Sequence, residues 1–243
     1  MLGRLRIKII NFTIITIEKL VFERQLRKYY KKIFGNNINL VIDVGSNKGQ
    51  TIDFFLKINP HCQIYGFEPN PALYNYLVNK YRHKKNVRLL NMGVSSETGE
   101  LLFHENVLNL TSSFESLNKD SAYLKTKARL LGVSVDNITK KSYPVKTIAL
   151  SEFIESNIRT DIDILKIDTE GHEYACLLGL FKKNLPVKIR YMQLESHNDN
   201  MYDSTISDKD ILGILEKNNF ELVQKIDHRI GDFDELIYRN TQI

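Results

Sequence analysis

The chain has 243 residues, 42% of them hydrophobic and 26% charged, which fits a single globular domain with a substantial core and excludes a disordered chain. Its two cysteines are too few for a disulfide framework, and no run approaches the roughly 18 apolar residues of a transmembrane helix. Nine of the 34 Lys and Arg residues but only two of the 29 acidic residues lie in residues 1–34, so the remainder is nearly neutral and DNA is not an expected partner.

Residues 1–36 are predicted to form a basic amphipathic arm that precedes the domain. Its apolar residues at helical spacing are Ile7, Ile10, Ile14, Ile17 and Val21. This spacing predicts a helical extension, although the many β-branched residues also fit a strand. Three interpretations stay open for the arm. It docks on the domain body, it forms an oligomer contact, or residues 1–34 contact a membrane peripherally through Lys and Arg on anionic head groups.

The arm is not expected to be a secretory signal. Asn11, Thr13 and Thr16 interrupt its apolar run, and no small-residue cleavage site follows. The sequence therefore predicts a cytoplasmic protein, with or without peripheral membrane contact.

The segment 37–243 alternates between short apolar runs and amphipathic stretches. Strands are predicted at 40–44, 63–67 and 87–90, with helices at 48–58 and 71–82 between them. A β-α-β-α-β order implies a parallel sheet with right-handed crossovers.

The middle, 95–145, is less regular, with an extra strand predicted at 101–104 and an insertion containing a short helix at 120–142. Beyond it, helices are predicted from Ser151, over 174–181 and around 211–215. The remaining predicted strands span 145–149, 163–167, 189–194, 220–225 and 234–239. The short turn around Gly231 predicts that the last two strands are antiparallel. We therefore expect one doubly wound α/β domain.

The most informative segment, VIDVGSNKGQT, is a buried strand that ends at Asp43 and turns through Gly45 and Gly49 into a helix. Glycines at such a turn let a ligand approach the backbone and expose the helix N-terminus. The spacing matches neither the dinucleotide G-x-G-x-x-G nor a P-loop. Because Asp43 would repel a phosphate, a cationic or neutral ligand is favoured.

Glu68 closes the second strand, 19 residues after Gly49. An acid at this place can accept both ribose hydroxyls of an adenosine. The alternative is a surface carboxylate that caps the following helix. Pro69 and Pro71 stiffen the loop between them.

Three motifs together resemble the FkbM family of S-adenosylmethionine-dependent methyltransferases: DVGSNKG at 43–49, GFEP at 66–69 and ILKIDTEGHE at 164–173. The third is the most diagnostic, and the resemblance runs from about residue 38 to residue 238. It implies a Rossmann-like methyltransferase fold, with a seven-stranded, mostly parallel sheet in the order 3-2-1-4-5-7-6 and the last strand antiparallel. It also implies methyl transfer to an oxygen, often a hydroxyl of a sugar, of a glycosylated metabolite or of a polyketide.

The resemblance makes S-adenosylmethionine the expected cofactor and a small molecule or glycan the expected acceptor. Glu68 would hold the ribose hydroxyls, Asp43 would lie near the methionine amino group, and Asn91 and Met92 would meet the adenine. The candidate cofactor-binding residues are Asp43, Gly45, Ser46, Asn47, Gly49, Glu68, Pro69, Asn91, Met92, Gly93 and Ser113.

Acids and imidazoles follow two later strands. Asp168 and His172 follow the strand at 163–167, and Glu195 and His197 follow the strand at 189–194. Ligands of open α/β sheets bind beyond the carboxyl ends of the strands, so these four side chains are the candidate catalytic residues. They could remove the proton of an acceptor hydroxyl, or Asp168 and Glu195 could bind a divalent metal such as Mg²⁺, or the cluster could be structural. Glu173 is assigned to the N-terminus of the next helix.

Other functions are weighed against methyl transfer to a sugar. The acceptor could instead be a small metabolite, a peptide or an RNA, or the domain could be a non-catalytic nucleoside-binding module. A nicotinamide oxidoreductase is disfavoured because its G-x-G-x-x-G turn is missing. The basic arm favours a membrane-associated acceptor.

Overall fold

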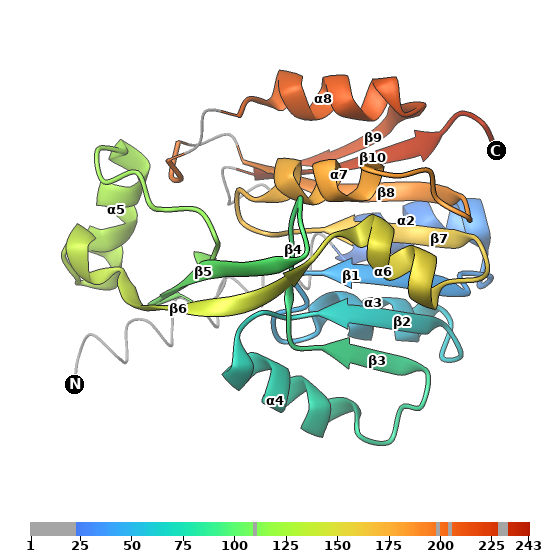
Figure 1. Cartoon of the computed structure of the whole chain (residues 1–243), viewed down its shortest axis with the longest axis horizontal. Helices are drawn as coiled ribbons and strands as arrows, with labels where there is room; N and C mark the ends of the chain where they lie inside the picture. Colours follow the sequence, from blue (N-terminus) through green and yellow to red (C-terminus); the bar gives the residue numbers. More distant parts are fainter. Residues whose placement is uncertain (1–22, 109–110, 198–199, 204–205, 228–232) are drawn as a thin grey trace.

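The computed structural model describes residues 23–108, 111–197, 200–203, 206–227 and 233–243 (Figure 1). The predicted apolar face of the arm, Ile7 to Val21, and the turn at Gly231 lie outside these ranges. The helices are α2 (Glu23–Phe34), α3 (Gln50–Ile58), α4 (Pro71–Tyr81), α5 (Ala122–Leu131), α6 (Leu150–Asn157), α7 (Glu173–Phe181) and α8 (Asp208–Lys217), with a 3-10 turn, η3 (Val135–Asn137). The strands are β1 (Leu40–Val44), β2 (Gln63–Phe67), β3 (Val87–Leu90), β4 (Gly93–Val94), β5 (Gly99–Asn106), β6 (Thr139–Ile148), β7 (Ile162–Ile167), β8 (Ile189–His197), β9 (Phe220–Asp227) and β10 (Phe233–Asn240).

Seven strands form the main sheet, in the order β3-β2-β1-β7-β8-β10-β9. The pairs from β3 to β8 are parallel, and β10 is antiparallel to both β8 and β9. When only the strands of this sheet are counted along the chain, the order is 3-2-1-4-5-7-6. The predicted fold, with its antiparallel last strand, is therefore confirmed.

The sheet separates two apolar cores because successive side chains of a strand point to opposite faces. On β1, Leu40, Ile42 and Val44 pack toward α6, α7 and α8, whereas Val41 packs toward α2, α3 and α4. The result is three layers, in which helices cover both faces of the sheet (Figure 1). All five residues of β1 are buried, as expected for the central strand of a doubly wound sheet.

Helix α2, the last part of the predicted arm, docks on the domain body. Leu26, Tyr30 and Phe34 recur every four residues on one face, and all three are buried in the core beside α3. The opposite face is basic and exposed, with Lys28 and Lys31 among its residues. Residues 23–34 are thus part of the domain body, and the three interpretations of the preceding segment stay predictions.

A second, three-stranded sheet has the order β4-β6-β5 and carries the insertion with α5. The predicted extra strand and the predicted insertion helix are both present. Strand β6 begins at Thr139, earlier than expected, because residues 139–144 have no apolar pattern and are held by antiparallel pairing with β5. Leu124 and Ala128 of α5 pack on Met201 and Tyr202, so the insertion has a small core of its own. Within the described ranges, no helix is long and apolar enough to cross a membrane.

Candidate active site

The turn from β1 into α3 packs directly against the end of β7. Gly45 and Gly49 have φ of +87° and +80°, a region that favours glycine. A Cβ on Gly45 would lie 1.8 Å from the carbonyl oxygen of Asp168, and one on Gly49 would lie 2.4 Å from the hydroxyl of Tyr81. Ser46, between the two glycines, is buried. The glycines are therefore required for the close approach of this turn to its own sheet.

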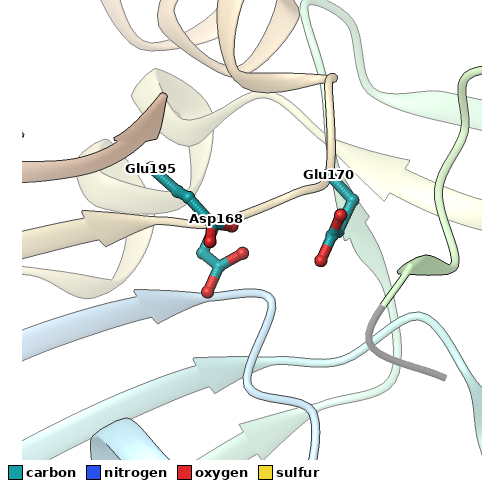
Figure 2. Close-up of side chains that lie close together, drawn as sticks. All are labelled: Asp168, Glu170 and Glu195. Atoms are coloured by element: carbon teal, nitrogen blue, oxygen red, sulfur yellow. The ribbon is translucent and has the colours of Figure 1, made fainter. Parts of the chain in front are cut away.

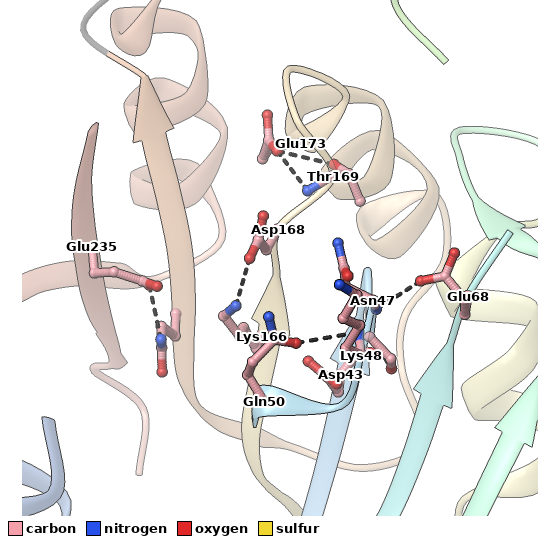
Figure 3. A network of polar contacts seen from close by, with 12 residues as sticks. Asp43, Asn47, Lys48, Gln50, Glu68, Lys166, Asp168, Thr169, Glu173 and Glu235 are labelled. Atoms are coloured by element: carbon pink, nitrogen blue, oxygen red, sulfur yellow. Dashed lines mark hydrogen bonds and ion pairs between the residues drawn. The ribbon is translucent and has the colours of Figure 1, made fainter. Parts of the chain in front are cut away.

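Glu68, at the end of β2, faces the turn. Its Oε2 accepts the backbone N–H of Asn47 at 2.6 Å, and its Oε1 accepts that of Asn70 at 2.8 Å (Figure 3). Burial raises the pKa of Glu68 to about 8, although the two N–H groups favour the charged form. The alternative of a surface carboxylate that caps α4 is wrong, because Glu68 is buried and the Asn70 side chain caps that helix by accepting two backbone N–H groups.

Asp43 is completely buried at the foot of the same turn. Among the described residues, neither of its carboxylate oxygens has a hydrogen-bond partner, and the same holds for Oδ1 of Asn47. Burial raises the pKa of Asp43 to about 6, while the nearby Lys166 ammonium opposes that shift. Buried acceptors without donors are costly, so the turn suits a ligand that brings N–H or O–H donors. The ammonium and ribose hydroxyls of S-adenosylmethionine fit this requirement.

The residues expected at the adenine, Asn91, Met92 and Gly93, already contact other parts of the protein. The amide of Asn91 donates to the backbone carbonyls of Glu68 (2.9 Å) and Pro69 (3.2 Å) and so ties the end of β3 to the loop after β2. Met92 is half-buried against the core under α6 and α7. A Cβ on Gly93 would lie 2.3 Å from the Phe114 ring. Their contact with adenine stays a prediction.

The ends of β7 and β8 bring three carboxylates together. Asp168, Glu170 and Glu195 each offer an oxygen within 4.8 Å of the other two (Figure 2). Asp168 forms an ion pair with Lys166, with 2.6 Å between Nζ and Oδ2. Burial, followed by the charge of Asp168, raises the pKa of Glu195 well above its ordinary value. Both effects favour the protonated form of Glu195 beside Asp168. We call Asp168, Glu170 and Glu195 the acid cluster.

The loop that carries the acid cluster is fixed by its neighbours. Glu170 is in the left-handed region, with φ of +57°, and its Oε2 accepts the hydroxyl of Tyr202 at 2.7 Å. Glu173 accepts the backbone N–H groups of Thr169 at 2.8 Å and of Gly171 at 3.3 Å. This confirms the predicted place of Glu173 at the N-terminus of α7.

The same loop is tied to the insertion. The hydroxyl of Ser113, predicted at the cofactor, donates to the carbonyl oxygen of Thr169 at 3.2 Å. Ser113 is buried and also pairs through its backbone with His104 of β5. It therefore lies against the loop after β7.

His172 is buried with both ring nitrogens engaged. Its Nδ1 lies 2.6 Å from Oε1 of Glu115, and its Nε2 lies 2.9 Å from the hydroxyl of Ser95. The order Ser-His-Glu is that of a nucleophile triad, but Ser95 is only 3% exposed. This geometry favours a positioning role, in which His172 joins β4, the insertion and α7. His197, the other candidate imidazole, is the last residue of β8, and its side chain lies outside the described part.

Several polar residues that adjoin the site are not among the predicted site residues. Gln193 and Glu235 are buried inside strands β8 and β10, and Tyr30 reaches them from α2. Glu170, which belongs to the motif at 164–173 but is not among the predicted site residues, is the third member of the acid cluster. The available signal was the presence of a polar residue within an otherwise apolar strand, because such a residue needs a partner.

Comparison with known proteins identifies the family of the chain. The family model for the methyltransferase FkbM domain matches residues 43–222. The chain is 23% identical to the 2-O-methyltransferase NoeI of Sinorhizobium fredii, over 84% of this chain and 80% of that protein. It is 27% identical to the 31-O-demethyl-FK506 methyltransferase FkbM of Streptomyces tacrolimicus (78% and 75%). It is 26% identical to the hexuronic acid methyltransferase AglP of Haloferax volcanii, and this match spans 72% of this chain and 60% of AglP.

Proposed function

Since the chain belongs to the FkbM methyltransferase family and is an S-adenosylmethionine-dependent methyltransferase, we propose that it methylates a hydroxyl oxygen of a sugar, a glycan or a glycosylated metabolite. Two relatives support an oxygen acceptor by their names, and a third is named for a hexuronic acid. The observation that carries the proposal is the acid cluster beside the glycine turn. Removing a hydroxyl proton requires a base near the methyl donor, and the cluster supplies one.

The donor end of the site would be formed by Glu68, Asp43 and the turn between them. S-adenosylmethionine supplies an electrophilic methyl group on a sulfonium centre. Glu68 accepts its ribose hydroxyls, since a carboxylate oxygen that accepts one N–H retains a lone pair. Asp43 accepts the ammonium of the methionine part, which would satisfy oxygens that are otherwise buried without donors. Gly45 and Gly49 would shape the turn that receives the donor, since both adopt positive φ.

Asp168 is the proposed general base. Its side chain is 26% exposed, whereas Glu195 is 8% exposed, so an acceptor can reach Asp168 more readily than Glu195. Glu170 is also partly exposed, but its Oε2 accepts the Tyr202 hydroxyl. As the acceptor oxygen bonds to the methyl carbon, the carbon–sulfur bond of the donor breaks and its electron pair stays on sulfur, which leaves S-adenosylhomocysteine. The hydroxyl proton passes to the Asp168 carboxylate. The Lys166 ammonium holds that carboxylate in place. His197 remains the alternative base, and His172 positions the loop.

The acid cluster also offers a second version of the chemistry. Three carboxylates whose oxygens lie within 4.8 Å of one another are a ligand set that suits a divalent cation such as Mg²⁺. A cation there would acidify the acceptor hydroxyl in place of a protein base. Activity that is lost with EDTA and restored by Mg²⁺ would favour this version. Activity unchanged by EDTA would leave Asp168 as the base.

A groove of about 340 Å³ beside the donor end supports a saccharide acceptor. It lies between the start of α4 and strand β6, and its lining includes Asn70, Asn75, Lys141 and Tyr143. Amides, an ammonium group and an aromatic ring are groups that bind carbohydrate hydroxyls and acid substituents. Tyr143→Ala is expected to raise the KM for the acceptor several-fold without changing the affinity for S-adenosylmethionine.

The test of the proposed function is a transfer assay. The purified protein is incubated with methyl-labelled S-adenosylmethionine and a panel of neutral glycans, hexuronic acid glycans and cell-envelope extracts. A labelled, mass-shifted glycan in the wild-type reaction, absent with Asp168→Asn, is the expected result. Label that enters only a peptide or an RNA would overturn the proposed acceptor class.

For the arm we propose peripheral contact with an anionic membrane. Exposed Arg24, Lys28, Lys31 and Lys32 lie on α2, and the chain before it is rich in isoleucine. A deletion of residues 1–22 keeps α2 in the core and is therefore the appropriate variant. Sedimentation with phosphatidylglycerol vesicles should fall in this variant and be weak for wild type with phosphatidylcholine. Equal sedimentation of wild type and the deletion would contradict the proposal.

A further inference from the structure

A row of polar side chains crosses the main sheet under α2 and α3. Asp43 on β1 stands beside Lys166 on β7, and Lys166 stands beside Gln193 on β8. The preceding row on the same face is apolar, with Val41 beside Ile164. Both Lys166 and Gln193 are buried. Polar groups in such a place must be satisfied by one another.

A buried chain of contacts leads from the N-terminal helix to this row. The hydroxyl of Tyr30 on α2 donates to Oε1 of Gln193 at 2.8 Å, and Nε2 of Gln193 donates to Oε2 of Glu235 at 2.8 Å. Lys166 donates to Asp168 at 2.6 Å (Figure 3). Tyr30 is completely buried, so water does not compete for its hydroxyl. We call Tyr30, Gln193 and Glu235 the relay.

The last link, from the relay to Lys166, follows from strand register. Lys166 on β7 stands beside Gln193 on β8, and the amide of Gln193 donates to Glu235 on β10. Lys166 is buried, and its ammonium donates to Asp168, the residue after β7. The position of the ammonium therefore depends on how Gln193 and Glu235 are held beside it.

We propose that the relay positions the Lys166 ammonium, and through it the Asp168 carboxylate that faces the acceptor, so that Tyr30, Gln193 and Glu235 are positioning residues for methyl transfer. The inference rests on the proposed role of Asp168 as the base. It makes α2 a functional part of the catalytic domain, because α2 supplies the first donor of the relay.

Tyr30 has a definite task because a glutamine amide can be placed in two orientations. In the observed one, Nε2 donates to Oε2 of Glu235 and Oε1 accepts from Tyr30, and in the other Oε1 would face Glu235 and Nε2 would face the Tyr30 hydroxyl. A phenol donates a hydrogen bond, and burial keeps the pKa of Tyr30 well above its ordinary value, so it remains a donor. The Tyr30 hydroxyl therefore selects the orientation in which Gln193 donates to Glu235.

The first test compares Tyr30→Phe with Tyr29→Phe in the full chain. Tyr29 is the neighbouring tyrosine on α2, with its ring 5.8 Å from that of Tyr30, and it is only half-buried. We expect Tyr30→Phe to lower kcat about tenfold while the KM for S-adenosylmethionine stays within twofold, and Tyr29→Phe to behave as wild type. A kcat equal to that of Tyr29→Phe would overturn the proposal.

A double-mutant cycle separates positioning from general destabilisation. If Tyr30 acts through Gln193, then Tyr30→Phe combined with Gln193→Met should be no slower than Gln193→Met alone. If Tyr30 and Gln193 were merely structural, each substitution should lower Tm independently, and kcat at saturating substrate should not change. Additive losses in kcat, or losses in Tm alone, would contradict the relay.

A spectroscopic readout needs no turnover and so distinguishes failure of the relay from failure of the proposed function. In protein labelled with 15N-lysine, the buried Lys166 ammonium should give a protected signal that Lys166→Met removes. Tyr30→Phe should shift or broaden that signal, and Tyr29→Phe should not. An unchanged signal overturns the relay whatever the activity. An inactive wild type with a shifted signal overturns only the proposed reaction.

Discussion

In the proposed active site, the carboxylates of the donor end and those of the acid cluster have opposite environments. At the donor end, Asp43 is buried with both oxygens lacking partners among the described residues, and Glu68 accepts only backbone N–H groups. At the acid cluster, the carboxylates are bonded to other side chains: Asp168 to Lys166, and Glu170 to Tyr202. The donor end thus leaves acceptor capacity for a ligand, whereas the acid cluster is held in place by the protein.

This difference fits the separate roles proposed for the donor end, which binds, and the acid cluster, which removes a proton. A ligand that brings donors can satisfy Asp43, so the free protein bears a cost that binding removes. A base must keep one position through the reaction, and satisfied hydrogen bonds provide this. Substitutions at the donor end should therefore change affinity and stability, and those at the acid cluster should change the rate.

The largest effect is expected for Asp168→Asn. Loss of the proposed base should lower kcat about 1,000-fold, because general base catalysis contributes on the order of 10²–10⁴ in rate. Calorimetry should give an affinity for S-adenosylmethionine within threefold of wild type. Asp120→Asn, in an exposed surface ion pair, is the matched control and should be fully active. Full activity of Asp168→Asn would remove the distinction between the two ends.

The next effect is expected for Glu68→Gln. The amide can accept only one of the two backbone N–H groups, and its own N–H₂ then faces the other. The Kd for S-adenosylmethionine should rise about 10- to 100-fold, which corresponds to about 1.4–2.8 kcal/mol, while kcat at saturation changes little. Glu100→Gln, at an exposed position on β5, is the control. A large loss of kcat with unchanged Kd would place Glu68 with the acid cluster instead.

Asp43→Asn should separate binding from stability. The pKa of Asp43 is about 6 in the folded protein against an ordinary 3.8, so the folded state holds this proton more tightly than the unfolded state. Ionisation of Asp43 therefore lowers the free energy of unfolding as the pH rises from about 4 to about 6. Above pH 6 the total loss is about 3 kcal/mol. Asp43→Asn should bind S-adenosylmethionine weakly yet unfold at higher denaturant concentration at pH 7, with little difference near pH 3. Lower stability at pH 7 would contradict this.

The smallest effect on the rate is expected at His172. In His172→Ala the hydrogen bonds to Glu115 and Ser95 are lost, which should lower the free energy of unfolding by about 1–3 kcal/mol. The fall in kcat should stay below tenfold, since His172 holds the loop and does not accept the proton. If His172→Ala lowered kcat as much as Asp168→Asn does, His172 would instead be the base.

The sheet could be predicted because its signals are local. Strands β1, β2 and β7 are short, largely apolar runs bounded by turn residues, and the strand order followed from the resemblance. The signals for the proposed donor end are local too, since Asp43, Gly45 and Gly49 stand within one motif and Glu68 follows closely. The start of β6 was missed because residues 139–144 are held by pairing rather than by an apolar pattern.

The acid cluster and the relay could be predicted only in part, because their members come together through strand register. Gln193 meets Lys166 because β7 and β8 are aligned at those positions, and Glu235 stands opposite Glu195 because β10 is antiparallel to β8. Tyr30 looks like a core residue of an amphipathic helix until its partner is known. Polar residues inside apolar strands indicate that such partners exist without identifying them.

In the proposed reaction, the contact between Gly45 and Asp168 would set the spacing between methyl donor and acceptor. The carbonyl oxygen of Asp168 occupies the space that a β-carbon on residue 45 would need, and the N–H of Asp168 donates to the carbonyl of Val44 at 3.1 Å. Any larger residue at position 45 would wedge β1 and β7 apart and lengthen the path from methyl carbon to acceptor oxygen. Gly45→Ala should therefore slow the reaction even where both reactants still bind, because an ångström of separation weighs heavily on a group-transfer barrier.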